Sequence, residues 1–184
     1  NFILNVASKG FSAMGLSSKD EAINLLKSEG SDYKVDGTKS DEEFIKKLSR
    51  PRKIMLLVPA GNPVDTVIER FLPYLDEGDI IIDGGNSHYD DTDRRYLYLK
   101  NKNIHFIGAG VSGGSKGARF GPSIMPGGDE ECYKKIQPIF EAAAAKVKKE
   151  PCVSYLGITS SGHYVKMIHN GIEYAIMQLI SENY

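Results

Sequence analysis

The sequence has no tryptophan and only two cysteines, Cys132 and Cys152, in its 184 residues. Two cysteines are too few for a disulfide framework, so we expect both thiols to be reduced, as is typical of cytosolic proteins. The chain also has neither a CxxC nor an HExxH motif, and no histidines and carboxylates stand at metal-ligand spacing. These absences predict a cytoplasmic protein without a bound metal ion.

Long apolar segments and an excess of one charge are also missing. The longest strongly apolar runs, such as Ile54–Val58 and Ile80–Ile82, are far too short to cross a bilayer. Residues 1–10 have an amphipathic rhythm and lack the apolar block of a secretory signal. Lysine and arginine number 23 against 24 aspartates and glutamates, a formal net charge of -1. We therefore expect neither a membrane nor a nucleic acid as a partner.

The middle of the chain alternates between short apolar runs, typical of strands, and amphipathic segments, typical of helices. Strands are expected at 53–58, 79–82 and 104–107, and helices at 62–76 and 90–102. Continuously apolar strands that alternate with helices predict a parallel sheet covered on both faces. The predicted fold class is therefore α/β, with a Rossmann-like, doubly wound and mostly parallel sheet. Glycines follow all three strands, at the edge where such sheets bind ligands.

Local signals place further helix boundaries. Two helices are expected to begin at capping boxes, in which Ser18 pairs with Glu21 and Ser40 pairs with Glu43. The two arginines of the helix at 90–102 are expected on its solvent side. Residues 108–128 read as one glycine-rich loop.

The segment 162–184 has the pattern of one long helix with a polar face. At about 100° per residue, Lys166, Asn170 and Glu173 lie within roughly 60° of each other, and His169 widens the arc to about 100°. The rest of the circumference is apolar, so we expect it to anchor the helix. A solvated helix face would explain the lysine and the glutamate equally well. Histidine and asparagine form helices poorly, however, so their presence on this arc favours a functional site.

Within the glycine-rich stretch, Ser112, Gly113 and Gly114 can present a hydroxyl and successive backbone N–H groups to an anion such as a carboxylate. A flexible surface loop with turn glycines would explain a bare SGG just as well. The ending FGPSIMPGG is more specific, because its composition is not that of a generic loop.

Three long runs resemble those of decarboxylating 6-phosphogluconate dehydrogenases, in the same order. They are IIDGGNSHYDDTDRR, GAGVSGGSKGARFGPSIMPGG and GHYVKMIHNGIEYAIMQLISE. The resemblance implies oxidative decarboxylation of 6-phospho-D-gluconate to D-ribulose 5-phosphate and CO2 in the pentose phosphate pathway, with hydride transfer to NADP. It also implies a homodimer in the full-length protein.

The resemblance carries over residue by residue. Lys166 matches the general base that takes the proton of the substrate 3-hydroxyl, which requires a pKa below the usual lysine value of about 10.4. Glu173 matches the acid that protonates C1 of the enediol left by decarboxylation. The implied substrate-binding residues are Asn86, Ser112, Gly113, Gly114, His169, Asn170 and Tyr174. The implied cofactor-binding residues are Val58, Pro59, Ala60 and Asn86, although the family often has lysine in place of Pro59.

Domain organisation follows from the same comparison of motifs. We expect a cofactor-binding domain at 1–158 and the start of a helical substrate and dimerisation domain at 159–184. The family pattern would place a first strand with a GxGxxG turn before Asn1 and more helices after Tyr184. Residues 12–18 are read as lacking the second strand and its NADP-binding arginine, with a probable gap near 11–12. The chain is therefore expected to be a fragment with an incomplete sheet.

Two other functions stay open. A 3-hydroxyisobutyrate-type dehydrogenase shares the superfamily motifs, but the segments HNGIEY and PSIMPGG argue against it. A non-catalytic remnant that serves as a binding module is favoured by the lost cofactor elements. The joint presence of Lys166, His169, Asn170 and Glu173 argues against that second alternative.

Overall fold

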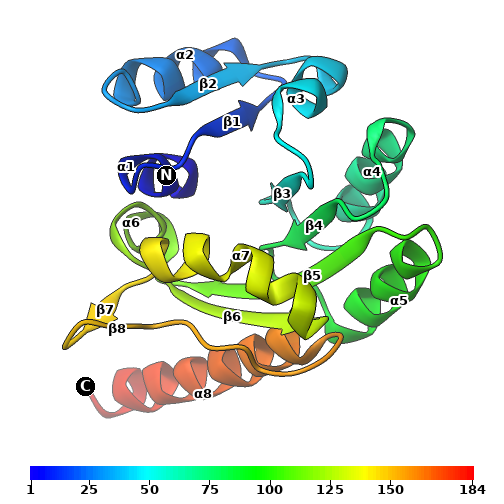
Figure 1. Ribbon diagram of the computed structural model, residues 1–184. Helices are drawn as coiled ribbons and strands as arrows, with labels where there is room; N and C mark the ends of the chain where they lie inside the picture. Colours follow the sequence, from blue (N-terminus) through cyan, green and yellow to red (C-terminus); the bar gives the residue numbers. More distant parts are fainter.

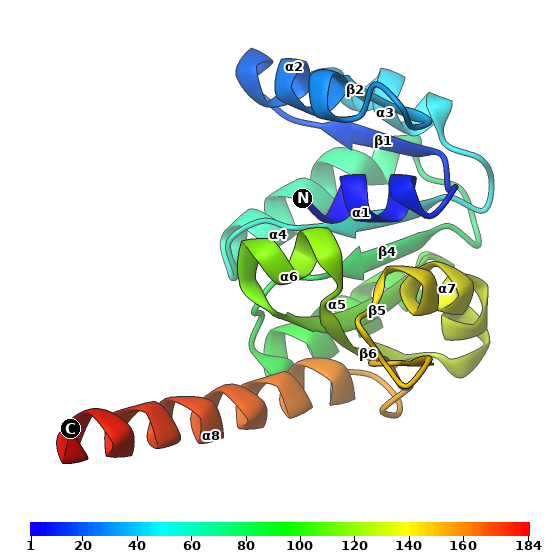
Figure 2. The same ribbon diagram turned by 90° about the vertical axis from the view of Figure 1, so that its left-hand side faces the viewer.

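A computed structural model describes the whole chain from Asn1 to Tyr184. Figure 1 shows sheets with helices on both sides, and Figure 2 shows the last helix reaching out from one edge of the body. The elements in chain order are α1 (Phe2–Ser8), β1 (Ala13–Leu16), α2 (Asp20–Glu29), β2 (Val35–Thr38), α3 (Asp41–Lys47), β3 (Lys53–Leu56), α4 (Asn62–Phe71), η1 (Leu72–Tyr74), β4 (Ile80–Asp83), α5 (Tyr89–Lys100), β5 (His105–Ser112), α6 (Gly114–Phe120), β6 (Ser123–Gly128), α7 (Glu130–Ala143), β7 (Lys146–Val147), β8 (Glu150–Pro151) and α8 (Ser161–Asn183).

The main sheet has the strand order β3-β4-β5-β6. Its first three strands are parallel, with Leu56 opposite Asp83 and Asp83 opposite Gly108, and β6 is antiparallel to β5. The predicted α/β fold with a mostly parallel sheet is thus confirmed. Because β3 and β4 end at the same edge, the loops that follow them meet there, beside the extension of β5 to Ser112.

Both faces of the sheet are covered, which explains why its strands are continuously apolar. All four residues of β4 are buried. Ile80 and Ile82 pack with α1 and α7, whereas Ile81 packs with α3, α4 and α5 on the other side. The alternation of successive side chains between two apolar clusters is what a doubly wound sheet requires.

β1 corrects the expectation of a gap near residues 11–12. It follows α1 after a turn at Gly10, whose φ is 93°, and it pairs in parallel with β2 from Ala13 opposite Val35 to Leu16 opposite Thr38. The short run AMGL escaped notice because alanine and glycine are weak strand formers and all four residues are only half-buried. Backbone pairing makes this strand, and side-chain pattern alone did not reveal it.

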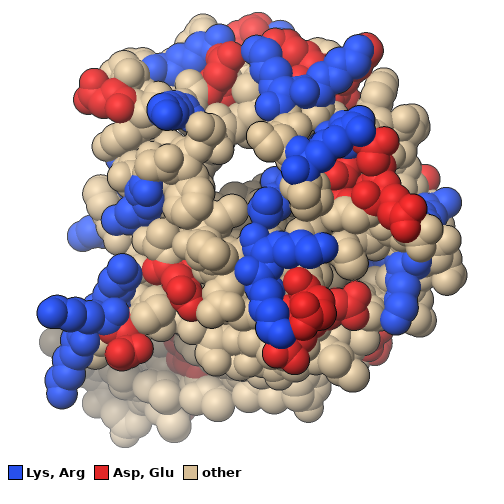
Figure 3. Space-filling model, in the orientation of Figure 1, with Lys and Arg blue, Asp and Glu red and all other residues tan.

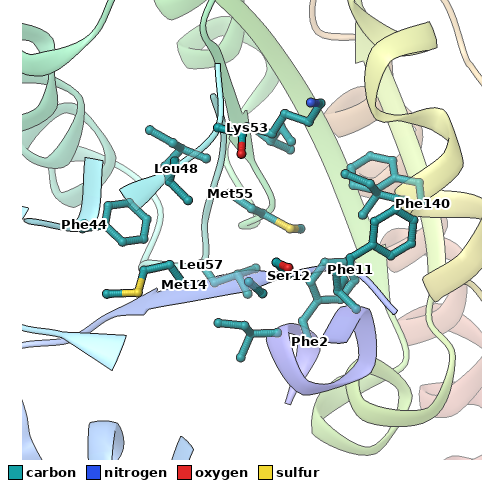
Figure 4. A pocket seen from close by; sticks show the side chains of 17 residues that line it. Phe2, Phe11, Ser12, Met14, Phe44, Leu48, Lys53, Met55, Leu57 and Phe140 are labelled. Carbon is teal, nitrogen blue, oxygen red and sulfur yellow. The ribbon is translucent and has the colours of Figure 1, made fainter. Parts of the chain in front are cut away.

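An apolar slot separates β1 from β3. Each of the two strands is hydrogen-bonded on one side only, to β2 and to β4 respectively. The slot has a volume of about 420 Å³ and is lined almost entirely by hydrophobic residues, among them Phe2, Phe11, Met14 and Met55 (Figure 4). In the space-filling view it opens through this face of the molecule (Figure 3). Two open strand edges with apolar walls are the surroundings that a further buried strand would need.

Residues 108–128 form strands and a helix in place of the single loop that we expected. β5 extends to Ser112, α6 follows, and β6 returns along β5 from Ser123 opposite Ser112 to Gly128 opposite Ile107. Pairing of the two strands satisfies backbone N–H and C=O groups of Gly108, Gly110 and Gly127, so these three glycines belong to strands and not to a turn. Because they have no side chains, α8 can pack directly against the backbone of these strands.

Other local expectations had mixed outcomes. Ser40 caps α3 as predicted, with its hydroxyl accepting from the Glu43 N–H at 3.2 Å. α2 begins after Lys19 without a side-chain cap, so the expected Ser18 box is wrong. Of the two arginines of α5, Arg94 is exposed, but Arg95 is only 1% exposed and points into the protein. Carboxylates inside the fold hold it there, as shown below.

α8 is anchored only through its first turns. Gly162, His163 and Lys166 are buried, and the later turns reach into solvent (Figure 2). Ile172 and Leu179, which we expected to anchor the helix, are 58% and 60% exposed. Neither α8 nor any other helix combines the length and the apolar character needed to span a membrane.

Candidate active site

A small pocket lies where the loop after β4 meets the first half of α8. It has a volume of about 190 Å³ and is lined by Asn86, Ser87, His88, His163, Lys166, Met167 and Asn170. Three residues that the sequence singled out, Asn86, Lys166 and Asn170, are therefore brought together. The loop and the helix are far apart in the sequence and meet only because α8 packs across β5 and β6.

α8 lies directly on these strands because the contact positions are glycines. A Cβ atom on Gly162 would lie 2.2 Å from the carbonyl oxygen of Gly108, and one on Gly110 would lie 2.5 Å from the Cβ of Lys166. Gly127 on β6 would meet the backbone N of Gly162 at 2.4 Å in the same way. This backbone contact places Lys166 over β5, so the glycines that we read as loop residues form the seat of the helix.

We expect Gly162→Ala to lower the free energy of unfolding of the chain by about 2 kcal/mol, because the new methyl group would overlap backbone atoms that cannot rotate away. Gly171→Ala on the same helix is the matched control, since a Cβ there meets nothing within 4 Å. That change should leave stability unchanged or raise it by up to about 1 kcal/mol, the helix propensity gained over glycine. Urea denaturation of both variants gives the two free energies of unfolding. Equal values would contradict the close packing of Gly162 against the strands.

Lys166 is 7% exposed although it carries an ammonium group. Its Nζ donates to Oδ1 of Asn170 at 2.7 Å. Burial lowers the pKa of Lys166, and the charge of Glu173 opposes that shift without cancelling it. A lysine with a lowered pKa loses its proton more readily and can then accept one from a neighbouring hydroxyl.

The side-chain oxygen of Asn170 is contacted by both Lys166 and His169. Nδ1 of His169 lies 3.3 Å from Oδ1 of Asn170, which leaves the amide nitrogen of Asn170 available as a donor. One turn later, Oε2 of Glu173 lies 3.7 Å from Nδ1 of His169. Glu173 and Tyr174 do not line the pocket, and Tyr174 is 65% exposed.

The remaining predicted residues lie at the ends of β5 and β3. Ser112 is half-buried at the end of β5, and Gly113 and Gly114, with φ values of 127° and 59°, turn the chain into α6. Ser112 lies on the same face of β5 as Gly108 and Gly110, because successive residues of a strand alternate between faces, but none of these three predicted residues lines the pocket with Lys166.

Val58, Pro59 and Ala60 follow β3. A Cβ atom on Gly85 would lie 3.1 Å from the carbonyl oxygen of Val58, so this segment lies beside the loop of Asn86. Pro59, Ala60 and Asn86 are exposed at this edge. Gly84 and Gly85, which lack side chains, follow β4 at this edge, and such an edge suits a dinucleotide, which approaches the backbone closely. No three His, Cys, Asp or Glu side chains come together as a metal site.

A buried ionic network lies beneath the pocket, and no sequence motif pointed to it. Arg95 donates to both carboxylate oxygens of Asp65 at 2.9 Å, to the carbonyl of Gly61 at 3.0 Å and to Oγ of Ser87 at 3.1 Å. Its Nη1 also lies 3.6 Å from Asp83, which is fully buried. Arg95, followed by Arg94, holds the pKa of Asp65 well below its usual range. The sequence signal for this network was Asp83, a charged residue at the end of the otherwise apolar strand β4.

His163 is a second residue that the motifs did not single out. Its ring is 2% exposed and lies between Thr92 of α5 and the end of β4. Burial lowers the pKa of His163, although the charge of Asp83 opposes the shift. The sequence signal is its position three residues before Lys166, on the same side of the helix.

Comparison with known families matches almost the whole chain. Residues 1–157 match the profile described as the NAD binding domain of 6-phosphogluconate dehydrogenase. Residues 162–184 match the profile of the C-terminal domain of 6-phosphogluconate dehydrogenase.

Individual relatives agree with these profiles. The chain is 52% identical over 185 residues to 6-phosphogluconate dehydrogenase, decarboxylating 1 of Saccharomyces cerevisiae, covering 100% of the chain and 38% of that protein. It is 51% identical to the NADP(+)-dependent, decarboxylating enzyme of Bacillus subtilis, covering 100% of the chain and 39% of that protein. The chain thus spans about two fifths of the length of these relatives. An alignment of 185 positions for 184 residues leaves no room for a missing segment near residue 11.

Solved structures have the same fold. A 6-phosphogluconate dehydrogenase of Plasmodium falciparum, whose structures include complexes with NADP+ and with 6-phosphogluconate, matches with a TM-score of 0.92 and 45% identity over 100% of this chain and 40% of that one. A 3-hydroxyisobutyrate dehydrogenase of Mycobacterium tuberculosis matches with a TM-score of 0.84 at 20% identity, over 100% of this chain and 59% of that one. Likeness at that low identity shows the shared fold alone.

Proposed function

The chain belongs to the family of 6-phosphogluconate dehydrogenases, and from this premise we propose that the whole protein converts 6-phospho-D-gluconate to D-ribulose 5-phosphate and CO2 with NADP. The observation that carries the proposal is the pocket that joins Asn86 to the buried pair Lys166 and Asn170. Its polar groups suit a hydroxylated substrate, and its lysine is protected from solvent.

Lys166 is the proposed base of the oxidation. Its neutral amine takes the proton of the substrate 3-hydroxyl, and burial supports this role because it lowers the pKa of the lysine. Bound NADP, held by the segment 58–60 and Asn86, would supply the acceptor for the hydride that leaves C3. The resulting 3-keto acid breaks its bond to the carboxyl carbon, CO2 leaves, and the electron pair passes toward the ketone. Lys166, now protonated, donates to that oxygen as the enediol forms.

Glu173 is the proposed acid of the last step. It lies seven residues after Lys166 on α8, and a rotation of about 100° per residue places the two on one side of the helix. A protonated Glu173 gives its proton to C1 of the enediol while the neutral amine of Lys166 takes back the hydroxyl proton, which yields the keto sugar. Its contact with His169 supplies a partner for the carboxylate that this transfer leaves.

The other predicted residues are proposed to bind. Asn170 and His169 contact the sugar acid, the backbone of Gly113 and Gly114 with the Ser112 hydroxyl contacts its carboxylate, and Tyr174 contacts its phosphate. Val58, Pro59, Ala60 and Asn86 lie along NADP, with Asn86 also reaching the substrate. The exposure of Pro59, Ala60 and Asn86 at one sheet edge supports this assignment.

We further propose that residues 1–158 form the cofactor-binding domain and that 159–184 begin a helical domain. The protein is proposed to act as a cytoplasmic homodimer that binds neither nucleic acid nor membrane. The exposed apolar side chains on the outer turns of α8 support a partner surface there, among them Ile172, Ile176, Met177, Leu179 and Ile180.

The test follows turnover and labelling in the full-length enzyme. With 6-phosphogluconate and NADP in deuterated water, the enzyme should release CO2 and form ribulose 5-phosphate with deuterium at C1. Glu173→Gln should lower product formation by about 100-fold, the usual scale for a lost general acid, and should deliver deuterium to C1 poorly.

Glu182→Gln is the control, because Glu182 lies on the same helix and only contacts Gln178. It should leave rate and labelling unchanged. Normal labelling in Glu173→Gln would reject its role as the acid. Absence of CO2 release by the unaltered enzyme would reject the proposed function itself.

A further inference from the structure

His163 connects the two parts of the candidate site. Its Nε2 lies 3.1 Å from the carbonyl oxygen of Asp83, and its Nδ1 lies 2.6 Å from the hydroxyl of Thr92. A carbonyl can only accept, so Nε2 carries the hydrogen and donates it to Asp83. Nδ1 of the neutral ring then accepts from the Thr92 hydroxyl at 2.6 Å, so this single hydrogen is not donated to the carbonyl oxygen of His88, which lies farther away at 3.1 Å.

Asp83 carries that connection into the loop of Asn86. Its carboxylate accepts from the Gly85 N–H at 3.0 Å and from the Ser87 hydroxyl at 2.6 Å, on either side of Asn86. One residue at the end of β4 thus orders the loop through its side chain and holds α8 through its carbonyl group. The two hydrogen-bonded links meet at Asp83, which is fully buried.

The glycine seat brings α8 close to the strands without a directional side-chain contact. Glycines 108, 110 and 127 let the helix approach closely, but they offer no side-chain group that could form a hydrogen bond with it. His163 supplies a directional contact at this interface, three residues before Lys166. A shift of the helix would therefore move Lys166 relative to Asn86 once this hydrogen bond is lost.

We propose that His163 is a positioning residue, which sets the placement of Lys166 on α8 relative to Asn86 on the loop after β4. The inference rests on the proposed function, because Lys166 and Asn86 must face one substrate for their relative placement to matter. A displacement of about 1 Å in such a pair can reduce turnover by about 100-fold. His163 does not itself touch the reacting atoms.

Three substitutions in the full-length enzyme separate positioning from simple packing. The amide of glutamine reaches about as far as Nε2 and can still donate to Asp83, whereas asparagine reaches only about as far as Nδ1. We expect His163→Asn and His163→Leu to lower kcat by about 10- to 100-fold with little change in KM, and His163→Gln to retain most of kcat. If His163→Leu does not fold, the comparison of His163→Gln with His163→Asn still tests whether His163 positions Lys166. Equal kcat in those two variants overturns the proposal.

Hydrogen exchange tests the same link without substrate or cofactor. In His163→Asn, amides of residues 84–88 and 162–167 should exchange faster than in the unaltered protein, while those of α7 on the other face of the sheet stay unchanged. His163→Gln should resemble the unaltered protein. Unchanged exchange of residues 84–88 in His163→Asn overturns the proposal even if the enzyme acts on a different substrate. An unaltered enzyme inactive on 6-phosphogluconate rejects the proposed function, and exchange alone then decides the role of His163.

Discussion

We expect Lys166→Met in the full-length enzyme to lower kcat by at least about 100-fold, the usual scale for the loss of a general base. Methionine matches the lysine side chain in length as far as Cε, so it can fill the buried space over Gly110 while removing the amine. The hydrogen bond from Nζ to Asn170 at 2.7 Å is lost with it. Because the proposed proton transfer occurs in the transition state, kcat and kcat/KM should fall together.

Lys135→Met is the matched control for this change. Lys135 is exposed on α7, which covers the face of the sheet opposite to α8 (Figure 1). Steady-state rates of NADPH formation for both variants make the measurement, with circular dichroism to check folding. A folded Lys166→Met enzyme with nearly normal kcat would exclude Lys166 as the base.

Replacing Arg95 should have the largest effect on stability. We expect Arg95→Met to lower the free energy of unfolding by about 3–5 kcal/mol, because it leaves the fully buried Asp83 without a nearby cation. Most of the cost should come from Asp83, since Asp65 is 30% exposed and solvent screens its charge. The same substitution removes the hydrogen bonds that Arg95 donates to the carbonyl oxygen of Gly61 and to the hydroxyl oxygen of Ser87.

The neighbouring Arg94 provides the comparison on the same helix. It also contacts Asp65, at 3.0 Å, but its side chain is 56% exposed. Arg94→Met should therefore cost less than about 1 kcal/mol. Adding Asp83→Asn to Arg95→Met should recover part of the loss, because the unpaired charge is then absent. Similar urea midpoints for the two arginine variants would contradict the buried network.

Periodicity predicted those elements in which one pattern dominates. The apolar runs of β3 and β4 and the amphipathic turns of α4 and α5 stand close to where they were expected, because the strands lie in continuous apolar runs and the helices repeat apolar residues at helical spacing. The spacing of Lys166, Asn170 and Glu173 likewise predicted that they share one side of a helix, and all three belong to α8. β1 was not predicted, since the alanine and glycine among its four residues interrupt any apolar run.

The site was predicted in part. A resemblance of motifs pointed to Lys166 and Asn86, and the pocket joins them. It did not point to Arg95, whose burial depends on Asp65 and Asp83, residues that come from two other elements. Nor did it reveal that Gly108 and Gly110 belong to a strand, because glycine in sequence signals a turn and only a neighbouring helix gives it another use.

The sequence by itself determined the α/β class, the alternation of strands and helices and the chemical groups on α8, because these depend on residue type and on spacing along one segment. Only the tertiary structure decided where α8 crosses the sheet, which charges are buried and how close Lys166 comes to Asn86. Those features depend on contacts between segments distant in the chain, such as His163 with Asp83. Burial and hydrogen bonding at such contacts act over a few ångströms of space, and no pattern along the chain encodes that distance.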